Sequence, residues 1–260
     1  MKIRLSSVFL YMLMLVGLIM LNYPSIANLV NRFNEGEILS GLEQSLDEKT
    51  EEELRNMKED AIEYNERLYK ETGNVIIDAF TNSSEVESTE YTSLLDITSD
   101  GAMGAVEIPK INEFLTIYHG TNTEILEKGI GHLQGTSLPV GGENTHSVLT
   151  GHTGLPSAEL FTNLDQLKKG DEFYIHILNE VLAYEVDQIK IVEPQETQDL
   201  EIEAEEDLVT LLTCTPYGIN SHRLMVRGHR VPYVMDDKEK LSGSARESIY
   251  GSGCYKRKSF

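Results

Sequence analysis

The feature of this sequence that most limits its fold is a series of short apolar segments, separated by glycine, proline and asparagine, that begins near Met103. Short apolar runs between turn residues are typical of β-strands, because a helix needs a longer amphipathic pattern. Asn179 and Glu180 predict a tight hairpin turn between two of these runs. Many short strands with few helices indicate a mainly β fold, a barrel or a sandwich, over residues 102–235. The expected strands are residues 104–108, 147–150, 172–178, 182–186, 190–193, 208–213 and 223–231.

The segment before this β region has a helical pattern. Apolar residues recur at spacings of three and four, so they line one face of a helix. We therefore expect residues 28–80 to form an N-terminal helical appendage. The residues of this apolar face are Leu54, Met57, Ala61, Tyr64 and Leu68.

Three further segments complete the expected organisation. Residues 157–168 are predicted to form a short helix, with Ser157 as its N-cap and Gly170 as its stop. Residues 81–101 are polar with little periodicity, which indicates a loop or linker. Residues 236–260 are predicted to be a polar C-terminal tail.

Residues 1–27 carry a membrane or export signal. Residues 5–21 contain no charged side chain, and a helix of that length approaches the thickness of a bilayer core. Lys2 and Arg4 favour a cytoplasmic N-terminus and an exported remainder. The segment 25–27, Ser-Ile-Ala, also fits a signal-peptidase site, so the alternative is a cleaved signal peptide. Either way, the rest of the chain is expected outside the cytoplasmic membrane.

Charge and cysteine content exclude several classes of function. The chain has 43 acidic and 22 basic residues and a net charge of −21, which argues against nucleic-acid binding. Two cysteines, Cys214 and Cys254, make no disulfide framework, and Cys254 lies in the polar tail. The histidines and cysteines lack metal-ligand spacing, so no metal site is expected.

Cys214 is the candidate nucleophile. It ends the apolar run that begins at Leu208 and precedes the turn residues Thr215-Pro-Tyr-Gly218. A residue at the end of a strand is expected to face a surface cleft, and an unpaired cysteine is unusual in an exported chain. The alternative is that Cys214 is a small buried apolar residue.

His152 and Arg223 are the candidate partners of Cys214. Gly151 and Gly154 flank His152, which gives its imidazole freedom to approach a partner. If residues 208–213 and 223–231 pair antiparallel, the connection returns Arg223 beside Cys214, where a guanidinium stabilises a developing oxyanion. A surface role for Arg223 and a structural role for His152 are the alternatives. The competing histidines are His119, His132, His146, His176, His222 and His229.

With these three residues in view, residues 102–232 resemble the catalytic core of a sortase, a cysteine transpeptidase of Gram-positive cell surfaces. The family signature Thr-Leu-x-Thr-Cys is matched by Thr210-Leu-Leu-Thr-Cys214, and its histidine region by His146-Ser-Val-Leu-Thr-Gly-His152. Several segments resemble the class C, pilus-polymerising branch in particular. They are Ile108-Pro-Lys-Ile111, Ile117-Tyr-His-Gly120, Ser137-Leu-Pro-Val-Gly-Gly142, Gly151-His-Thr-Gly-Leu-Pro156 and Thr213-Cys-Thr-Pro-Tyr-Gly-Ile-Asn220.

The resemblance implies a closed β-barrel of about eight strands with short helices. Cys214 would attack the Thr–Gly bond of a Leu-Pro-x-Thr-Gly-like sorting signal. His152 would transfer protons, and Arg223 would stabilise the intermediate. A lysine of a pilin protein would then resolve the thioester, and no cofactor is implied. The implied location is the cell membrane, held by residues 5–21, with the catalytic domain outside.

Two other functions stay open. A sortase can attach proteins to cell-wall peptide instead of polymerising pilins. A secreted cysteine peptidase would hydrolyse its substrate, although papain-like enzymes place the cysteine before the histidine, and here His152 precedes Cys214.

The chain departs from class C sortases at the expected lid. Many of these enzymes fill the active site with an Asp-Pro-aromatic motif, and no proline lies between Pro24 and Pro109 here. We therefore expect an open site, or a lid of another design formed within residues 81–101. Tyr91 and residues 94–96 are the candidates for such a cover.

Overall fold

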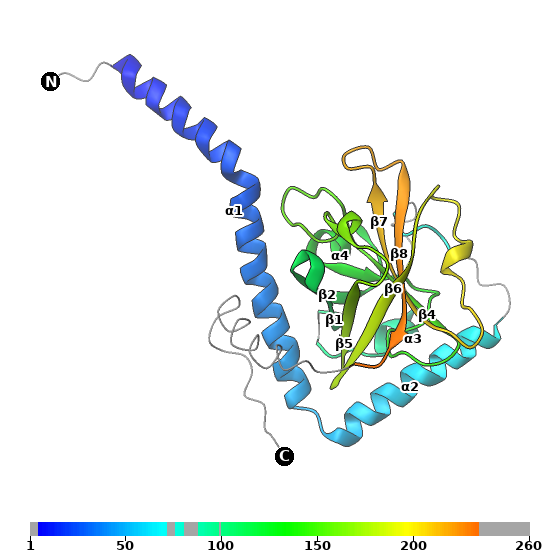
Figure 1. Cartoon of the computed structure of the whole chain (residues 1–260). Helices are drawn as coiled ribbons and strands as arrows, with labels where there is room; N and C mark the ends of the chain where they lie inside the picture. Colours follow the sequence, from blue (N-terminus) through cyan, green and yellow to red (C-terminus); the bar gives the residue numbers. More distant parts are fainter. Residues whose placement is uncertain (1–4, 72–75, 81–87, 99, 234–260) are drawn as a thin grey trace.

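The computed structural model describes residues 5–71, 76–80, 88–98 and 100–233. Its centre is a closed β-barrel in which the strands follow the order β1-β2-β3-β4-β7-β8-β6-β5 (Figure 1). The closed barrel with short helices and N-terminal helices confirms the expected fold class. The predicted polar tail, with Cys254, lies outside the described residues.

Neighbouring strands are antiparallel except for two parallel pairs, β2 with β3 and β4 with β7. The strands are β1 (Ala102–Ile108), β2 (Glu113–His119), β3 (Ile130–His132), β4 (Thr145–Thr150), β5 (Glu172–Ile177), β6 (Glu180–Val192), β7 (Asp207–Thr215) and β8 (His222–Val231). The α-helices are α1 (Leu5–Asp47), α2 (Glu51–Lys70), α3 (Thr89–Ser93) and α4 (Thr123–Lys128). Short 3-10 helices are η1 (Pro109–Ile111), η2 (Leu164–Gln166) and η3 (Gln198–Leu200).

The strand predictions fail in three places. β2 is missing from the expected set, although its β-branched and aromatic residues are typical of a buried strand. β3 is three residues long, too short for a periodic pattern. The two strands expected at 182–186 and 190–193 are one strand, because the register shift between Val186 and Gln188 lets β6 continue past its polar residues.

Helix α2 matches its predicted apolar face. It starts with a capping box in which Thr50 and Glu53 satisfy each other's backbone groups. Leu54, Ala61 and Leu68 are buried, and Leu54 and Ala61 belong to the main core cluster. The helical region is shorter than expected, since α2 ends at Lys70 and residues 76–80 are not helical.

Helix α1 runs alongside the barrel in its C-terminal half and projects away from it in its N-terminal half (Figure 1). Among the described residues, no single helix is long and apolar enough to cross a membrane. The two parts of α1, Tyr11–Tyr23 and Ser25–Asp47, meet the criterion only together and are bent by 48°.

The helix expected at residues 157–168 does not form. The segment is a series of turns followed by η2, and Leu160 has a φ of 43°, outside the range of an α-helix. Its apolar side chains do not share one helical face, and an irregular path buries all of them. These buried residues are Ala158, Leu160, Phe161, Leu164 and Leu167.

The region expected to be a loop at residues 81–101 contains helix α3, while residues 81–87 lie outside the described part. Tyr91 of α3 is fully buried in the main core. Its hydroxyl lies 2.8 Å from Nδ1 of His132 and accepts a bond from the Gly120 amide. Tyr91 therefore fastens α3 to the barrel core and does not cover a cleft.

Candidate active site

Strands β7 and β8 bring the candidate nucleophile and the candidate arginine together. They pair antiparallel, and Cys214 stands directly opposite Arg223. The expected pairing is thus confirmed. Arg223 is the second residue of β8 and Cys214 the second-last of β7, so both lie at the same end of the barrel wall.

His152 lies just beyond β4, which runs parallel to β7. Thr150 pairs with Leu212, and the Gly151 amide donates to the Leu212 carbonyl at 3.1 Å. Continuing that register places His152 at the level of Cys214. The structure therefore gathers all three sequence-predicted residues at one end of three adjacent strands, β4, β7 and β8.

A threonine of the signature fastens the histidine loop to β7. The Thr213 hydroxyl donates to the Gly151 carbonyl at 2.6 Å and lies 2.8 Å from the Thr153 hydroxyl. It therefore holds the residues before and after His152. The loop also requires a glycine at position 154, where φ is +76° and a Cβ atom would lie 2.8 Å from the Tyr217 ring.

Residues 76–80 cover the site, and Asp78 makes the strongest contact. Its two carboxylate oxygens accept bonds from Nε and Nη2 of Arg223 at 2.6 and 2.7 Å. Both side chains are buried, with 7% and 6% of their area exposed. The carboxylate thereby occupies the donors with which Arg223 would hold an oxyanion.

Phe80 contacts both Arg223 and His152. The guanidinium carbon of Arg223 lies 4.9 Å from the centre of the Phe80 ring, a cation–π contact. The ring centre of Phe80 also lies 5.6 Å from that of His152. Within the described part of the chain, no hydrogen bond joins the Cys214 thiol to the His152 ring.

The same segment belongs to an apolar cluster. Ile76, Ala79 and Phe80 pack with side chains from strands β4, β6, β7 and β8, from the residue after β3 and from the segment between β6 and β7. We call residues 76–80 the cover segment. The other side chains of the cluster are Leu133, Val148, Val192, Leu200, Leu212 and Met225.

The expectation of an open site is therefore wrong, and the cover lies before the region in which it was expected. Asp78-Ala79-Phe80 provides the carboxylate and the aromatic ring of an Asp-Pro-aromatic motif, with alanine in place of proline. Cys214 is consequently buried at 6% exposure instead of facing an open cleft. The sequence did not predict this motif because alanine replaces its proline, although the contacts need only the acid and the ring.

Burial shifts both candidate catalytic groups toward their neutral forms. Burial raises the pKa of the Cys214 thiol, and the charge of Asp78 raises this pKa further, whereas the charge of Arg223 lowers it. Burial also lowers the pKa of the His152 imidazole, against a small opposite effect of Glu127. With the cover segment in place, the neutral forms of the thiol and of the imidazole are both favoured. The described residues include no group of three or more histidines, cysteines and acids arranged for a metal ion.

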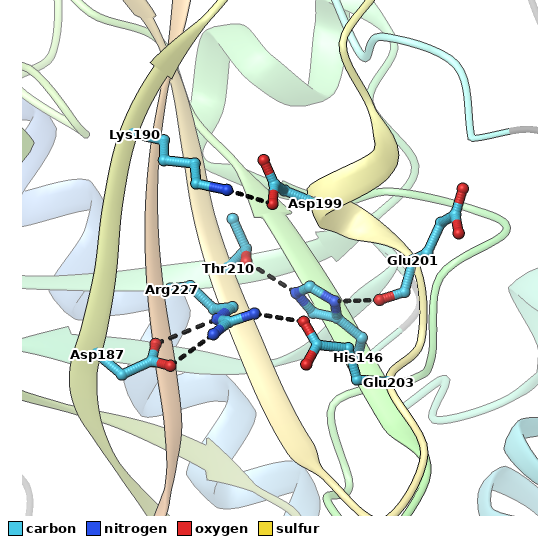
Figure 2. A network of polar contacts seen from close by, with 8 residues as sticks. All are labelled: His146, Asp187, Lys190, Asp199, Glu201, Glu203, Thr210 and Arg227. Atoms are coloured by element: carbon cyan, nitrogen blue, oxygen red, sulfur yellow. Dashed lines mark hydrogen bonds and ion pairs between the residues drawn. The ribbon is translucent and has the colours of Figure 1, made fainter.

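A second polar network lies further along the same three strands (Figure 2). His146 of β4 is fully buried, and its ring nitrogens bond to the Glu201 carbonyl and the Thr210 hydroxyl, each at 2.8 Å. Arg227 of β8 donates to both carboxylate oxygens of Asp187 on β6 at 3.1 and 2.6 Å. This network fastens the segment between β6 and β7 to the barrel.

Comparison with known proteins supports the same family. Residues 106–231 match the Sortase domain model. Sortase D of Bacillus subtilis is 35% identical over 133 residues, which cover 50% of this chain and 64% of that protein. The chain thus spans somewhat less than two thirds of that relative.

Solved structures cover more of the molecule. Sortase C of Streptococcus pneumoniae, described with insights into catalysis and pilin substrate specificity, is 47% identical with a TM-score of 0.71, covering 77% of this chain and 99% of that one. Sortase C-1 of Actinomyces oris is 49% identical with a TM-score of 0.66, covering 70% and 99%. Sortase C1 of Streptococcus agalactiae is 46% identical with a TM-score of 0.69, covering 75% and 97%. The fold, the signature strand and these likenesses together establish that the chain belongs to the sortase family, in its class C branch.

Proposed function

We propose that this sortase is a cysteine transpeptidase that joins pilin subunits, with Cys214 as nucleophile, His152 as proton carrier and Arg223 as oxyanion-stabilising group. The observation that carries the proposal is the register of β7 and β8, which sets the thiol opposite the guanidinium. Sortases are cysteine transpeptidases, and pilins are supported as substrates by the similarity to the S. pneumoniae Sortase C.

The first half of the reaction forms a thioester. The sulfur of Cys214 attacks the threonine carbonyl carbon of a Leu-Pro-x-Thr-Gly-like sorting signal, and Arg223 stabilises the negative charge on the carbonyl oxygen. The bond to glycine then breaks. His152, which took the proton of the Cys214 thiol as the sulfur attacked, gives that proton to the departing amine, and the threonyl group stays on sulfur as a thioester.

The second half transfers the acyl group to an amine. A lysine amine of a second pilin attacks the thioester and gives its proton to His152, and the Cys214 sulfur leaves and recovers a proton. The product is an isopeptide bond. Since the thioester retains the energy of the cleaved peptide bond, the transfer proceeds without ATP.

The cover segment must leave before substrate enters. Asp78 binds the guanidinium of Arg223, and Ile76, Ala79 and Phe80 pack in the adjacent apolar cluster. We propose that apolar residues of the sorting signal replace these three side chains in the cluster. Binding of substrate and release of the cover segment are then linked, since both compete for one site.

We also propose that residues 5–21 hold the enzyme in the cell membrane with the barrel outside, or that cleavage after Ala27 releases it. The uncharged segment and its flanking Lys2 and Arg4 support this location. Export to the cell surface would bring the barrel to its pilin substrates.

The test is Cys214→Ala, with Cys254→Ala as the matched control. Purified Cys214→Ala should lose at least about 10³-fold in peptide-to-amine transfer, while Cys254→Ala keeps the wild-type rate. In the native host, Cys214→Ala should abolish covalent pilin ladders. Full transfer by Cys214→Ala would reject the proposal. Wild-type cleavage without any increase in product on adding amine would instead identify a hydrolytic peptidase.

A further inference from the structure

The loop that carries His152 folds back on itself. The Phe161 amide donates to the His152 carbonyl at 3.2 Å, and the Thr153 hydroxyl donates to the Phe161 carbonyl at 3.3 Å. The Gly154 amide donates to the Thr162 hydroxyl at 3.0 Å. The outer arm of the loop, residues 159–162, therefore helps to place the backbone of His152, together with the contacts that Thr213 makes on its other side.

Helix α1 holds this outer arm through Glu159. Nδ2 of Asn28 donates to one carboxylate oxygen of Glu159 at 3.2 Å, and Nη2 of Arg32 donates to the other at 3.2 Å. Asn28 and Arg32 are four residues apart, so they lie on one face of the helix. Both oxygens of Glu159 are thus bonded to the same helix, 127 and 131 residues away in the sequence.

The α1 face is itself fixed to the barrel. Glu35 is 4% exposed and accepts a hydrogen bond from the Thr116 amide of β2. One and two turns further on, Leu39 and Leu42 are buried. The position of Arg32 relative to the barrel is therefore set by contacts on its C-terminal side, and the helix can hold Glu159 at a defined place.

Glu113 of β2 completes the cluster, at 3.4 Å from Arg32. The charged groups that face it are Arg32 and Glu35 of α1 and Glu159 of the loop. Burial raises the pKa of Glu113 to about 8, against the lowering effect of Arg32 and with help from the neighbouring carboxylates. Glu113 is therefore protonated at neutral pH, which leaves the charge of Arg32 directed at Glu159.

We propose that Asn28 and Arg32 of helix α1 are positioning residues for His152, acting through Glu159 and the bond from Phe161 to the His152 carbonyl. The N-terminal helix thereby takes part in catalysis as well as in connecting the barrel to the preceding segment. The catalytic consequence rests on the proposed function, whereas the structural coupling does not.

The experiment uses the full chain with Arg32→Gln, Glu159→Gln and the double variant. Lys58→Gln is the matched control, since Lys58 joins helix α2 to Glu180 of β6 by a similar ion pair away from His152. Amide exchange at Phe161 should become about three- to five-fold faster in both single variants, because the pair is partly exposed and its energy is modest. The double variant should match the single ones, and Lys58→Gln should match the wild type.

Kinetics give the second measurement. Arg32→Gln and Glu159→Gln should lower kcat for peptide transfer by the same three- to five-fold with KM unchanged, as expected for misplacement of the proton carrier by about the energy of this pair. Arg32→Lys should recover most of the rate. Equal loss in Lys58→Gln would contradict the proposal, since it would indicate a general loss of helix docking.

The pH dependence of Phe161 amide exchange gives the third measurement. As the pH rises from about 7 to 9, Glu113 loses its proton, competes for Arg32 and repels Glu159. Phe161 exchange, corrected for intrinsic base catalysis, should rise over this range in the wild type and stay flat in Glu113→Gln. Unchanged Phe161 exchange in Arg32→Gln, or additive effects in the double variant, would overturn the inference. If the wild type transfers no peptide, the proposed function fails, and the exchange data still decide the coupling.

Discussion

Strands β7 and β8 carry two similar groups of side chains, and each strand's residues in one group lie four residues from those in the other. A histidine accompanies each group, one from β4 and one from just after its end. Cys214, Arg223 and His152 form the upper one, and Thr210, Arg227 and His146 form the lower one shown in Figure 2. Each arginine is held by a two-pronged carboxylate contact. The two sites differ in where that carboxylate comes from.

Asp187, the partner of Arg227, belongs to barrel strand β6, whereas Asp78, the partner of Arg223, belongs to the cover segment outside the barrel. The histidines differ in the same way. Both ring nitrogens of His146 are bonded inside the wall, and among the described residues the His152 ring contacts Phe80 without a hydrogen bond. We propose that the carboxylate from the barrel strand makes a structural site, and that release of the carboxylate from the cover segment leaves the same residue types available for chemistry.

The largest effect should separate the two histidines. His152→Gln should lower the transfer rate by roughly 10²–10⁴-fold, as expected when a proton carrier is lost, with little change in stability. His146→Gln should lower the free energy of unfolding by about 1–3 kcal/mol, because it leaves a buried partner unsatisfied, and should retain the rate per folded molecule. Peptide transfer and urea unfolding measure both. A stable, fully active His152→Gln would remove the distinction.

The next largest effect should distinguish the two arginines. Arg223→Lys keeps the charge but loses the planar fork, so the transfer rate should fall by roughly 10²-fold. Arg227→Lys should cost about 1–3 kcal/mol of stability through the weakened contact with Asp187, with less than about three-fold change in rate. The same two assays apply. Comparable rate losses in both variants would mean that Arg223 acts only through packing.

The two aspartates should have opposite effects on access to the thiol. Asp78→Ala removes the charge-assisted bonds that close the cover segment, so iodoacetamide should alkylate Cys214 about 10- to 100-fold faster. Loss of burial and of the Asp78 charge should also lower the pKa of the thiol, which shifts the alkylation profile to lower pH. Asp187→Ala should leave the alkylation rate unchanged and reduce stability. No acceleration in Asp78→Ala would show that the cover segment does not limit access.

The sequence predicted all three candidate site residues, but of the contacts at the site it predicted only the one that depends on nearby chain. Cys214 and Arg223 are joined by one hairpin, so counting the connection predicted their pairing. The contact of Thr213 with Gly151 required knowing that β4 and β7 lie side by side, which no local pattern reveals across 62 residues. Asp78 was not predicted because alanine follows it in place of the proline that marks the motif. β3 was missed because three residues carry no periodicity.

The smallest expected effect is the pH dependence that His146 gives to stability. Burial lowers the pKa of His146 in the folded protein, so below its ordinary value near 6.5 the unfolded chain binds more protons. Stability from this group is therefore complete above about pH 6.5 and falls as the pH drops toward the folded pKa, by up to about 1.4 kcal/mol per pH unit.

Buried His132, whose pKa is lowered to about 4, adds a parallel slope. His146→Gln should remove only its own share of the slope between about pH 6.5 and 5, as measured by urea unfolding at each pH. Burial lowers the pKa of half-buried His152 as well. Opening the cover segment exposes the His152 ring again. The Asp78→Ala background should therefore reduce the His152 contribution to the slope of stability against pH and leave the His146 contribution intact. An equal reduction of both contributions would mean that opening the upper site also loosens the lower network, and the two groups of side chains would then be one cooperative unit.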